Sequence, residues 1–318
     1  MSGRPVLRDG TRAAGDTPGA PGSASAEPAG SAPDPLSADT APPSIAAALQ
    51  SGLRAGLDRL DAQLLLLFAL GRAPHDRAWL LTHDSDGLGA KDWARIADLF
   101  QRRLAGEPAA YLLGEKEFHG LDLRVDARVL VPRPDTETLV DWALACLQGR
   151  SAPRVIDLGT GSGAIALAVQ RARPDARVEA VDASADALAV AAANAQRLGL
   201  PVAFRQASWL EGAPRAAYDL IVSNPPYIAE GDPHLPALRH EPRAALVAGT
   251  DGLDDLRQIV RDAPVHLAAG GWLLLEHGHD QAAAVRQLLA DAGFADIQHR
   301  HDLSGIARCT GGTWAPVK

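Results

Sequence analysis

The spacing of apolar residues predicts a small helical unit near the start of the chain. From Ser44, leucine, isoleucine and phenylalanine recur at helical spacing as far as Phe68, and the segment AKDWARIADLFQRRLAG shows the same behaviour over residues 90–106. This period places the apolar side chains on one face of each helix. We therefore expect a helical domain over residues 44–106.

After residue 106, apolar residues recur at every second position instead of at helical spacing. Leu121, Leu123 and Val125 alternate with charged residues, and Val129 to Val131 follow after a short break. Alternation of this kind is typical of a strand with one buried face. We expect a β-hairpin linker over residues 107–134.

Strand and helix patterns alternate over residues 135–318. The expected strands are residues 154–158, 176–182, 202–207, 218–223 and 271–278, with two short strands at the end, and the expected helices include residues 184–198, 253–267 and 280–292. Such alternation predicts an α/β domain with a mostly parallel sheet covered on both faces. A ligand is expected at the carboxyl ends of its strands.

Composition limits the possible functions. The chain has 318 residues, 47% of them hydrophobic and 22% charged, which is enough for one large core and a smaller second unit. A formal net charge of −8 gives no electrostatic reason to expect a nucleic-acid partner. The two cysteines, Cys146 and Cys309, are too few for a disulfide framework or a metal cage, so we expect a reducing compartment.

Residues 1–43 are rich in Ala, Pro, Gly and Ser and contain no aromatic residue. They cannot bury enough apolar surface to offset the entropy of ordering, so we expect a disordered tail. The start of the chain has no continuous apolar segment, and Asp9, Asp16 and Glu27 argue against a mitochondrial transit peptide. No apolar run is long enough to span a bilayer, so we expect a cytoplasmic protein.

The segment VIDLGTGSGAIALA places Gly159, Gly161 and Gly163 between a strand and a helix, where the backbone can approach a ligand closely. With Ala164, the segment also fits the dinucleotide pattern G-x-G-x-x-G/A, and Asp182 follows about 20 residues later, where a ribose-binding acid is expected. A nicotinamide enzyme therefore remains an alternative, as does a glycine turn that only packs a helix on the sheet.

Asp157 favours a different cofactor. A carboxylate two residues before the first glycine would lie near the diphosphate of a dinucleotide, where like charges repel, but it suits the ammonium group of a methionine moiety. This indicates S-adenosylmethionine, with Asp182 accepting from the ribose hydroxyls and Ser208 and Trp209 near the adenine. The alternatives are a strand-end turn for Asp182 and an ordinary core ring for Trp209.

The segment YDLIVSNPPYIAE ends a buried strand with Asn224, Pro225, Pro226 and Tyr227. The prolines fix the backbone, so the Asn224 side-chain oxygen and the Pro225 carbonyl can each accept one N–H of a planar amino group. Accepting both protons stabilises the positive charge that develops as a methyl group arrives, and Tyr227 offers a face for stacking. The pattern favours amino-group methylation, and the alternative is a Pro-Pro turn after an edge strand.

NPPY after YDLIVS, with DLGTGSG upstream, resembles the class I methyltransferases that modify planar nitrogens of adenine, guanine or glutamine. Together with GEPAAYLLGEKEFHG, VLVPRPDTETLV, SNPPYIAEGDPHL and WLLLEHG, it resembles the peptide chain release factor glutamine methyltransferase family, often called HemK or PrmC, over residues 45–314. The resemblance implies a Rossmann-like class I methyltransferase fold with a mostly parallel seven-stranded sheet over residues 135–318, and a helical domain that grips a protein.

The resemblance also implies a reaction, which is methyl transfer from S-adenosylmethionine to the side-chain amide nitrogen (N5) of glutamine in the Gly-Gly-Gln loop of class I release factors. Asn224 and Pro225 would be catalytic. The expected substrate contacts are Asn224, Pro225, Pro226, Tyr227, Phe118, Arg133 and Glu137. The expected cofactor contacts are Asp157, Gly159, Thr160, Gly161, Ser162, Gly163, Asp182, Ser208, Trp209 and Asn224. For Phe118 and Glu137 the alternatives are a core aromatic in the hairpin and an acid in the first turn of a helix.

Other functions fit the sequence less well. An rRNA or DNA amino-methyltransferase would use the same clamp but should carry a basic groove, and a non-catalytic cofactor-binding module would not need Asn224. His277 and His279, like His299 and His301, are alternate strand residues, which we interpret as strand-end histidines rather than metal ligands. We expect a monomer with no metal, no membrane contact and no direct nucleic-acid binding.

Overall fold

The computed structural model describes Leu36 and residues 41–315. The predicted disordered tail lies almost entirely outside these residues. Within the described part of the chain, no helix is both long and apolar enough to cross a membrane.

Five helices come first in the described chain: α1 (Ile45–Ala55), α2 (Arg59–Ala69), α3 (Arg77–Thr82), α4 (Ala90–Leu104) and α5 (Ala109–Leu113). The helical pattern before Phe68 is split because Gly56 adopts a left-handed conformation that ends α1, and Asp58 caps the N-terminus of α2. Gly52 lets α1 approach α4, since a Cβ there would lie 2.6 Å from the Phe100 ring. These helices share a hydrophobic core of their own.

A two-stranded antiparallel hairpin follows, formed by β1 (Glu115–Phe118) and β2 (Leu121–Arg124). The expected hairpin is therefore present, but the expectation that Val129 to Val131 extend it is wrong. These residues form no strand, and the Val129 carbonyl accepts instead from the Tyr111 hydroxyl. Their apolar character reflects burial, because Val129 and Val131 pack in a small cluster with α8 residues.

The main sheet has seven strands: β3 (Arg154–Leu158), β4 (Arg177–Asp182), β5 (Ala203–Gln206), β6 (Tyr218–Ser223), β7 (Leu267–Glu276), β8 (Ala295–His301) and β9 (Ala307–Trp314). Their order is β5-β4-β3-β6-β7-β9-β8. The first five strands in this order are parallel, and β9 runs antiparallel to both of its neighbours. The predicted mostly parallel sheet is thus confirmed.

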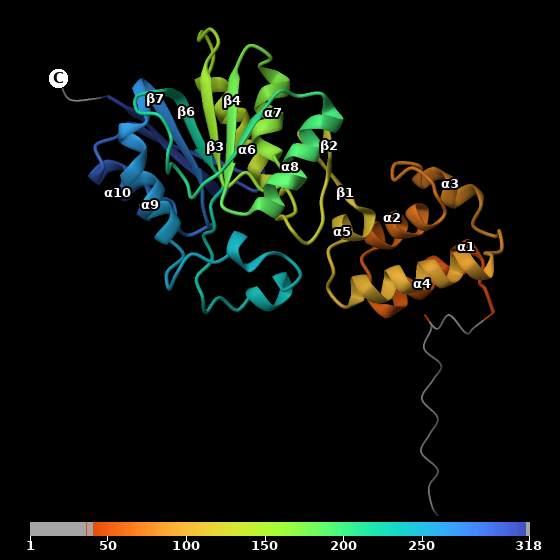
Figure 1. Cartoon of the computed structure of the whole chain (residues 1–318). Helices are drawn as coiled ribbons and strands as arrows, with labels where there is room; N and C mark the ends of the chain where they lie inside the picture. Colours follow the sequence, from red (N-terminus) through yellow and green to blue (C-terminus); the bar gives the residue numbers. More distant parts are fainter. Residues whose placement is uncertain (1–35, 37–40, 316–318) are drawn as a thin grey trace, which may run out of the picture. The chain divides into compact units, whose positions relative to one another are not determined.

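Helices cover both faces of this sheet (Figure 1). They are α6 (Asp135–Cys146), α7 (Ala164–Ala172), α8 (Ala185–Leu198), α9 (Asp254–Asp262) and α10 (Ala282–Asp291), with short 3₁₀ turns at η1 (Leu235–Leu238), η2 (Arg243–Ala245) and η3 (Ala263–Val265). Val155 packs in the layer of α6, α7 and α8, whereas its neighbour Ile156 packs in the layer of α9 and α10. The helix predicted over residues 253–267 ends at Asp262 because Pro264 cannot continue it.

The order of the strands decides where a ligand can bind. The chain moves outward from β3 through β4 to β5 and then returns to the other side of β3 as β6. Leu158 and Ser223 are paired at the ends of β3 and β6, so the glycine loop and the NPPY segment leave the sheet side by side. In an open parallel sheet, this reversal is the place where ligands bind.

Candidate active site

The glycine loop after β3 is fixed by the neighbouring strand β4. The backbone N–H groups of Gly159 and Thr160 both donate to the Val181 carbonyl at 2.9 Å. The N–H of Gly161 donates to the Asp182 carboxylate at 2.9 Å. Gly159, Gly161 and Gly163 all have positive φ, which a residue with a Cβ adopts only with strain.

Asp157 lies below this loop, where its carboxylate is completely buried. Its Oδ2 accepts from the Thr160 hydroxyl at 2.6 Å and from the Ala166 N–H at 3.2 Å, whereas Oδ1 has no hydrogen-bond partner. Burial raises the pKa of Asp157 to about 7, against the effect of these two hydrogen bonds. Asp157 thus supports the loop from below and leaves one acceptor oxygen free.

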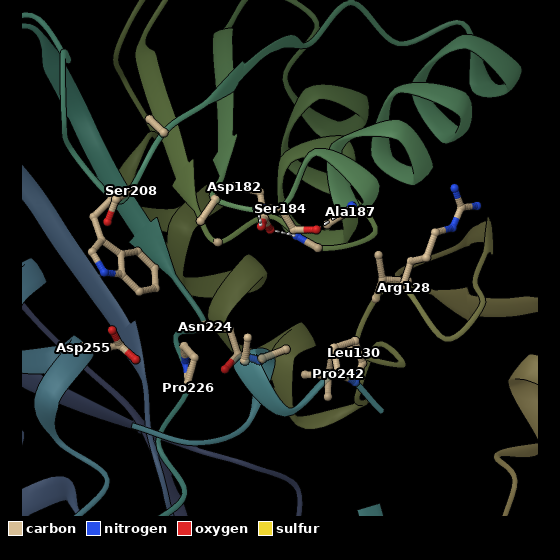
Figure 2. Close-up of a pocket in the computed structure, with 18 residues that line it drawn as sticks. Arg128, Leu130, Asp182, Ser184, Ala187, Ser208, Asn224, Pro226, Pro242 and Asp255 are labelled. Atoms are coloured by element: carbon tan, nitrogen blue, oxygen red, sulfur yellow. Dashed lines mark hydrogen bonds between the residues drawn. The ribbon is translucent and has the colours of Figure 1, made fainter. Parts of the chain in front are cut away.

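A cavity of about 380 Å³ opens beside the loop at the carboxyl ends of β3, β4 and β6 (Figure 2). It is lined by Arg128, Val129, Leu130, Gly159, Gly161, Asp182, Ala183, Ser184, Ala187, Ala207, Ser208, Trp209, Asn224, Pro226, Pro242, Ala244, Ala245 and Asp255. Ser208 and Asp255 lie at one end of the view and Arg128 at the other, with Asp182 and Asn224 between them (Figure 2). We call this the first cavity.

The first cavity contains most of the residues that sequence analysis assigned to a cofactor. Gly159, Gly161, Asp182, Ser208, Trp209 and Asn224 all line it. Asp157, Thr160, Ser162 and Gly163 do not. Thr160 and Ser162 are almost fully buried, so the structure places them in the body of the loop rather than on the cavity wall.

Trp209 is held in an unusual position. Its backbone φ is +48°, a region that a bulky residue seldom adopts. A Cβ on Gly159 would lie 3.1 Å from the Trp209 ring, so the indole packs directly against the glycine loop. Trp209 also hydrogen-bonds to Asp255, which lowers the pKa of that carboxyl against the larger rise caused by burial. The ring therefore forms a fixed wall of the first cavity.

A second cavity, also of about 380 Å³, adjoins the first. Arg133, Tyr227 and Glu241 line it, and Leu130, Asn224 and Ala245 line both cavities. Asn224 is the polar side chain among these shared residues. It can therefore contact one ligand in each cavity.

The Asn224 side chain has a defined orientation. Its Nδ2 donates to the Thr136 hydroxyl at 3.2 Å, and no described residue donates to its Oδ1. The preceding residue is also fixed, because the Ser223 hydroxyl donates to the Leu158 carbonyl at 2.7 Å. Pro226 lines the first cavity and Tyr227 the second, whereas Pro225 is buried and lines neither. The expected role of the Pro225 carbonyl stays a prediction.

Arg133 forms an ion pair in the second cavity. Its Nη2 donates to Glu241 Oε1 at 2.5 Å, and Glu241 Oε2 accepts from the Val131 N–H at 3.1 Å. The Glu241 side chain is only 3% exposed, whereas that of Arg133 is 38% exposed. Glu241 therefore holds a guanidinium whose free edge can face a ligand.

The structure does not bring Phe118 and Glu137 to either cavity. Phe118 is 1% exposed and packs with Leu121 and Leu139 in the main core, which is the role of a core aromatic in the hairpin. Glu137 lies in the first turn of α6 and accepts from the His119 N–H at 3.0 Å. Both positions match the structural alternatives rather than direct contact with a ligand.

Sequence analysis missed four polar residues of the site, namely Thr136, Glu241, Asp255 and Glu276. Only Glu276 carried a visible signal, since it is a charged residue at the end of the apolar run WLLL. It is almost completely buried, and burial raises its pKa to about 7.

Among the described residues there is no cluster of three or more His, Cys, Asp or Glu that could hold a metal.

Two of the four histidines considered as strand-end residues, the buried His277 and the partly buried His299, belong to one hydrogen-bonded chain. His277 Nε2 and His299 Nδ1 both contact the Thr310 hydroxyl, at 2.7 and 2.8 Å. His277 Nδ1 contacts the Gly278 carbonyl at 2.9 Å, so it must carry the proton. Burial lowers the pKa of both histidines, which disfavours their charged forms.

Two protein-family models match the chain, the Methyltransferase small domain over residues 137–241 and the PrmC N-terminal domain over residues 47–114. The release factor glutamine methyltransferase of Bordetella pertussis is 54% identical, and the match covers 81% of this chain and 95% of that protein. The protein of the same name from Pseudomonas aeruginosa is 50% identical, over 81% of this chain and 93% of its own length.

Solved structures resemble the fold as well. The hMettl16 catalytic domain in complex with MAT2A 3'UTR hairpin 6 is 17% identical, and the match covers 66% of this chain and 82% of that chain with a TM-score of 0.51. At this identity, the likeness concerns the fold alone.

Proposed function

Since the chain belongs to the release factor glutamine methyltransferase family, we propose that it transfers a methyl group from S-adenosylmethionine to the side-chain amide nitrogen (N5) of a glutamine in class I peptide chain release factors. The glutamine is that of the Gly-Gly-Gln loop. The observation that carries the proposal is the position of Asn224 in the wall shared by the two cavities. The chain acts as a monomer, and residues 44–106 help to bind the release factor.

The first cavity fits S-adenosylmethionine. Asp157 does not line this cavity, but its Oδ1 is a buried acceptor without a partner directly beneath the glycine loop, and its charge there suits a cationic ammonium group bound above the loop. Asp182 lines the cavity, and its two oxygens can each accept from a ribose hydroxyl in addition to the backbone N–H that each already binds. Trp209 gives a flat apolar wall for the adenine.

The bound cofactor supplies an electrophilic methyl carbon. The residues of the chain supply position and electrostatics, which account for most of the acceleration in a displacement of this kind. Asn224 Oδ1, which no described residue occupies, accepts one N–H of the substrate amide, and the Pro225 carbonyl accepts the other. The amide nitrogen thereby faces the first cavity with its lone pair free.

A glutamine amide needs this help because its lone pair is delocalised into its carbonyl group. Two fixed acceptors raise the electron density on nitrogen and stabilise the positive charge that develops as the N–C bond forms. The methyl group would leave as its bond to the cofactor sulfur breaks, and the cationic nitrogen would then lose one N–H proton to solvent, so no strong base is required before the methyl group moves. Tyr227 lies next along the chain in the second cavity and stacks against the carboxamide.

The second cavity is where the release factor loop enters. Arg133 presents a partly exposed guanidinium there, held by Glu241. Its N–H groups can donate to backbone carbonyls of an extended peptide. A guanidinium can also bind phosphate, so the choice of a peptide over a nucleic acid rests on the net charge of −8.

The test is to incubate the purified chain with methyl-labelled S-adenosylmethionine and, in parallel, with a class I release factor or with bare rRNA. We expect label in the release factor, and mass spectrometry should place it on the glutamine of the Gly-Gly-Gln loop. Label in rRNA and none in the release factor would show instead that the chain is an amino-methyltransferase acting on nucleic-acid bases.

A further inference from the structure

Glu276 is a buried carboxyl group on the strand next to the one that leads into the NPPY segment. It is the last residue of β7, and Leu275 before it pairs with Ser223 of β6. If this register is continued by one residue, Glu276 lies beside Asn224. Glu276 lines neither cavity and is 2% exposed. Burying a carboxyl group costs free energy of folding, so we expect Glu276 to have a role that offsets this cost.

The polar contacts around Asn224 have a fixed direction. Asn224 Nδ2 donates to the Thr136 hydroxyl, so the oxygen of Thr136 is an acceptor there and its proton is free to donate. The Thr136 hydroxyl and the Asn224 NH₂ group are the donors that act on the Glu276 carboxyl group, and they lower its pKa against the larger rise from burial. Glu276 Oε2 is a buried acceptor with no hydrogen-bond partner, so this carboxyl group can still accept from a neighbouring donor. An ionised carboxylate can only accept, so it attracts the NH₂ end of Asn224 and repels the oxygen end.

From this geometry we infer that Glu276, together with Thr136, is a positioning residue that holds the Asn224 amide with its NH₂ end toward the protein and its Oδ1 toward the substrate. The inference rests on the proposed function and adds to it the reason why Asn224 Oδ1 faces the substrate as an acceptor. Without this partner the carboxamide can rotate by half a turn, which would present an NH₂ group to the substrate NH₂ group.

Asn194 shows how a fully satisfied amide differs. Its Oδ1 accepts from the Arg124 N–H, and its Nδ2 donates to the carbonyls of Arg124 and Ser162. Both ends of this side chain are occupied by backbone groups. In Asn224 only the NH₂ end is occupied, so its oxygen is kept available for a ligand.

The inference predicts a dependence on pH. Only the ionised form of Glu276 is restricted to accepting, because the protonated form carries an O–H that can donate to Asn224 Oδ1. Burial raises the pKa of Glu276 to about 7. The charged and titratable groups that act on this carboxyl, or on which it acts, are Asp135, Arg308, Tyr227 and Cys309. Asp135 raises the pKa and Arg308 lowers it, so they partly cancel.

The first experiment compares kinetics with binding. In Glu276→Gln, we expect kcat for release factor methylation to fall by about 10- to 100-fold, because the neutral amide no longer selects one orientation of Asn224. The Kd for S-adenosylmethionine and the KM for the release factor should change little. Asp219→Asn is the matched control, because Asp219 is on β6 at the opposite end from Asn224, where it accepts from Arg150 and Arg154.

The second experiment needs no turnover. The sequence contains only two asparagines, Asn194 and Asn224, so ¹⁵N-asparagine labelling gives two pairs of side-chain NH₂ signals. In the free protein, the Asn224 pair should shift with pH with a midpoint near 7, the value to which burial raises the pKa of Glu276. The Asn194 pair should not move. In Glu276→Gln the titration of Asn224 should disappear.

Thr136→Val provides an independent variant should Glu276→Gln fail to fold. It keeps the shape of the side chain but removes the hydroxyl, so we expect a similar loss of kcat, and Thr136→Ser should restore the rate. Normal kcat in Glu276→Gln or in Thr136→Val, or Asn224 signals that do not titrate in the unmodified protein, would overturn the inference. A wild-type chain that methylates no release factor would refute the proposed function instead, and the NMR titration would still test the positioning of Asn224.

Discussion

The backbone N–H of Gly161 donates to the carboxylate of Asp182 over 2.9 Å, so the end of β4 holds the loop that follows β3. The other carboxylate oxygen accepts from the Ser184 N–H, also at 2.9 Å, at the start of α8. Asp182 thus fixes two backbone segments while it faces the first cavity. Its role in shaping the loop cannot be separated from its role in binding a ribose.

For this reason Asp182→Asn should weaken cofactor binding. One of the two backbone N–H groups would then face the NH₂ end of the new side chain and lose its acceptor, which costs about 1–3 kcal/mol. We expect the Kd for S-adenosylmethionine, measured by calorimetry, to rise about tenfold or more. Asp186→Asn, an exposed change in the first turn of α8, should leave the Kd unchanged. Equal affinities in both variants would contradict this role.

Two glycines of the loop, Gly161 and Gly163, should contribute differently to the stability of the fold and to cofactor binding. Gly163 has φ +86°, and a Cβ there would lie 3.0 Å from Leu167 and 3.3 Å from Ala191, between α7 and α8. Gly161 has φ +55° and open space around its missing Cβ, but it lines the first cavity. Gly163→Ala should therefore lower the free energy of unfolding by about 1–3 kcal/mol, through strain and crowding together.

Gly161→Ala should instead cost only about 1 kcal/mol of stability from the strained backbone, but reduce affinity for the cofactor more strongly. Urea unfolding of the two variants and titration with S-adenosylmethionine test this contrast. The explanation is wrong if Gly161→Ala proves the less stable of the two.

Stability should fall as the pH rises from about 4 toward 7. Burial raises the pKa of Asp157 from 3.8 to about 7, so between these values the folded chain holds a proton that the unfolded chain has lost. Protons bound only by the folded state stabilise it, and this stabilisation is lost as the pH rises through the window. Glu276 acts in the same direction.

In Asp157→Asn the decrease with pH should therefore be smaller, by up to about 1.4 kcal/mol per pH unit. Urea unfolding between pH 4.5 and roughly pH 7 measures this slope directly. A slope as steep as that of the unmodified chain would show that Asp157 is not protonated in the folded state within this window.

Features with a local cause were predictable from the sequence. The glycines, Asp182 and Asn224 stand directly at strand ends, and the alternation of strands and helices places those ends at one edge of the sheet. The ends of α1 at Gly56 and of α9 before Pro264 also have local causes, but the spacing of apolar residues predicts no break at Gly56 and a helix that continues to residue 267, so both boundaries were missed. The strand expected at Val129 to Val131 failed because apolar residues in a buried connecting segment show no different spacing from those of a short strand.

The remainder of the site depends on tertiary contacts. Thr136 reaches Asn224 across 88 positions of sequence, and Glu241 reaches Arg133 across 108. No local pattern marks such pairs, since each residue separately resembles an ordinary helix or loop position. Phe118 illustrates the opposite difficulty, because an aromatic in a hairpin is expected equally in the core and in a binding site, and the structure places it in the core.

The most direct measurement of the central claim compares the wild-type chain with Asn224→Ala on a class I release factor, with mass spectrometry of the glutamine in its Gly-Gly-Gln loop. The variant removes the oxygen that accepts from the substrate amide but leaves the glycine loop, Asp182 and Trp209 in place. We expect it to bind S-adenosylmethionine with nearly normal affinity and to add no methyl group to the glutamine, whereas the wild-type chain adds one. Methylation of that glutamine by Asn224→Ala at the wild-type rate would contradict the account.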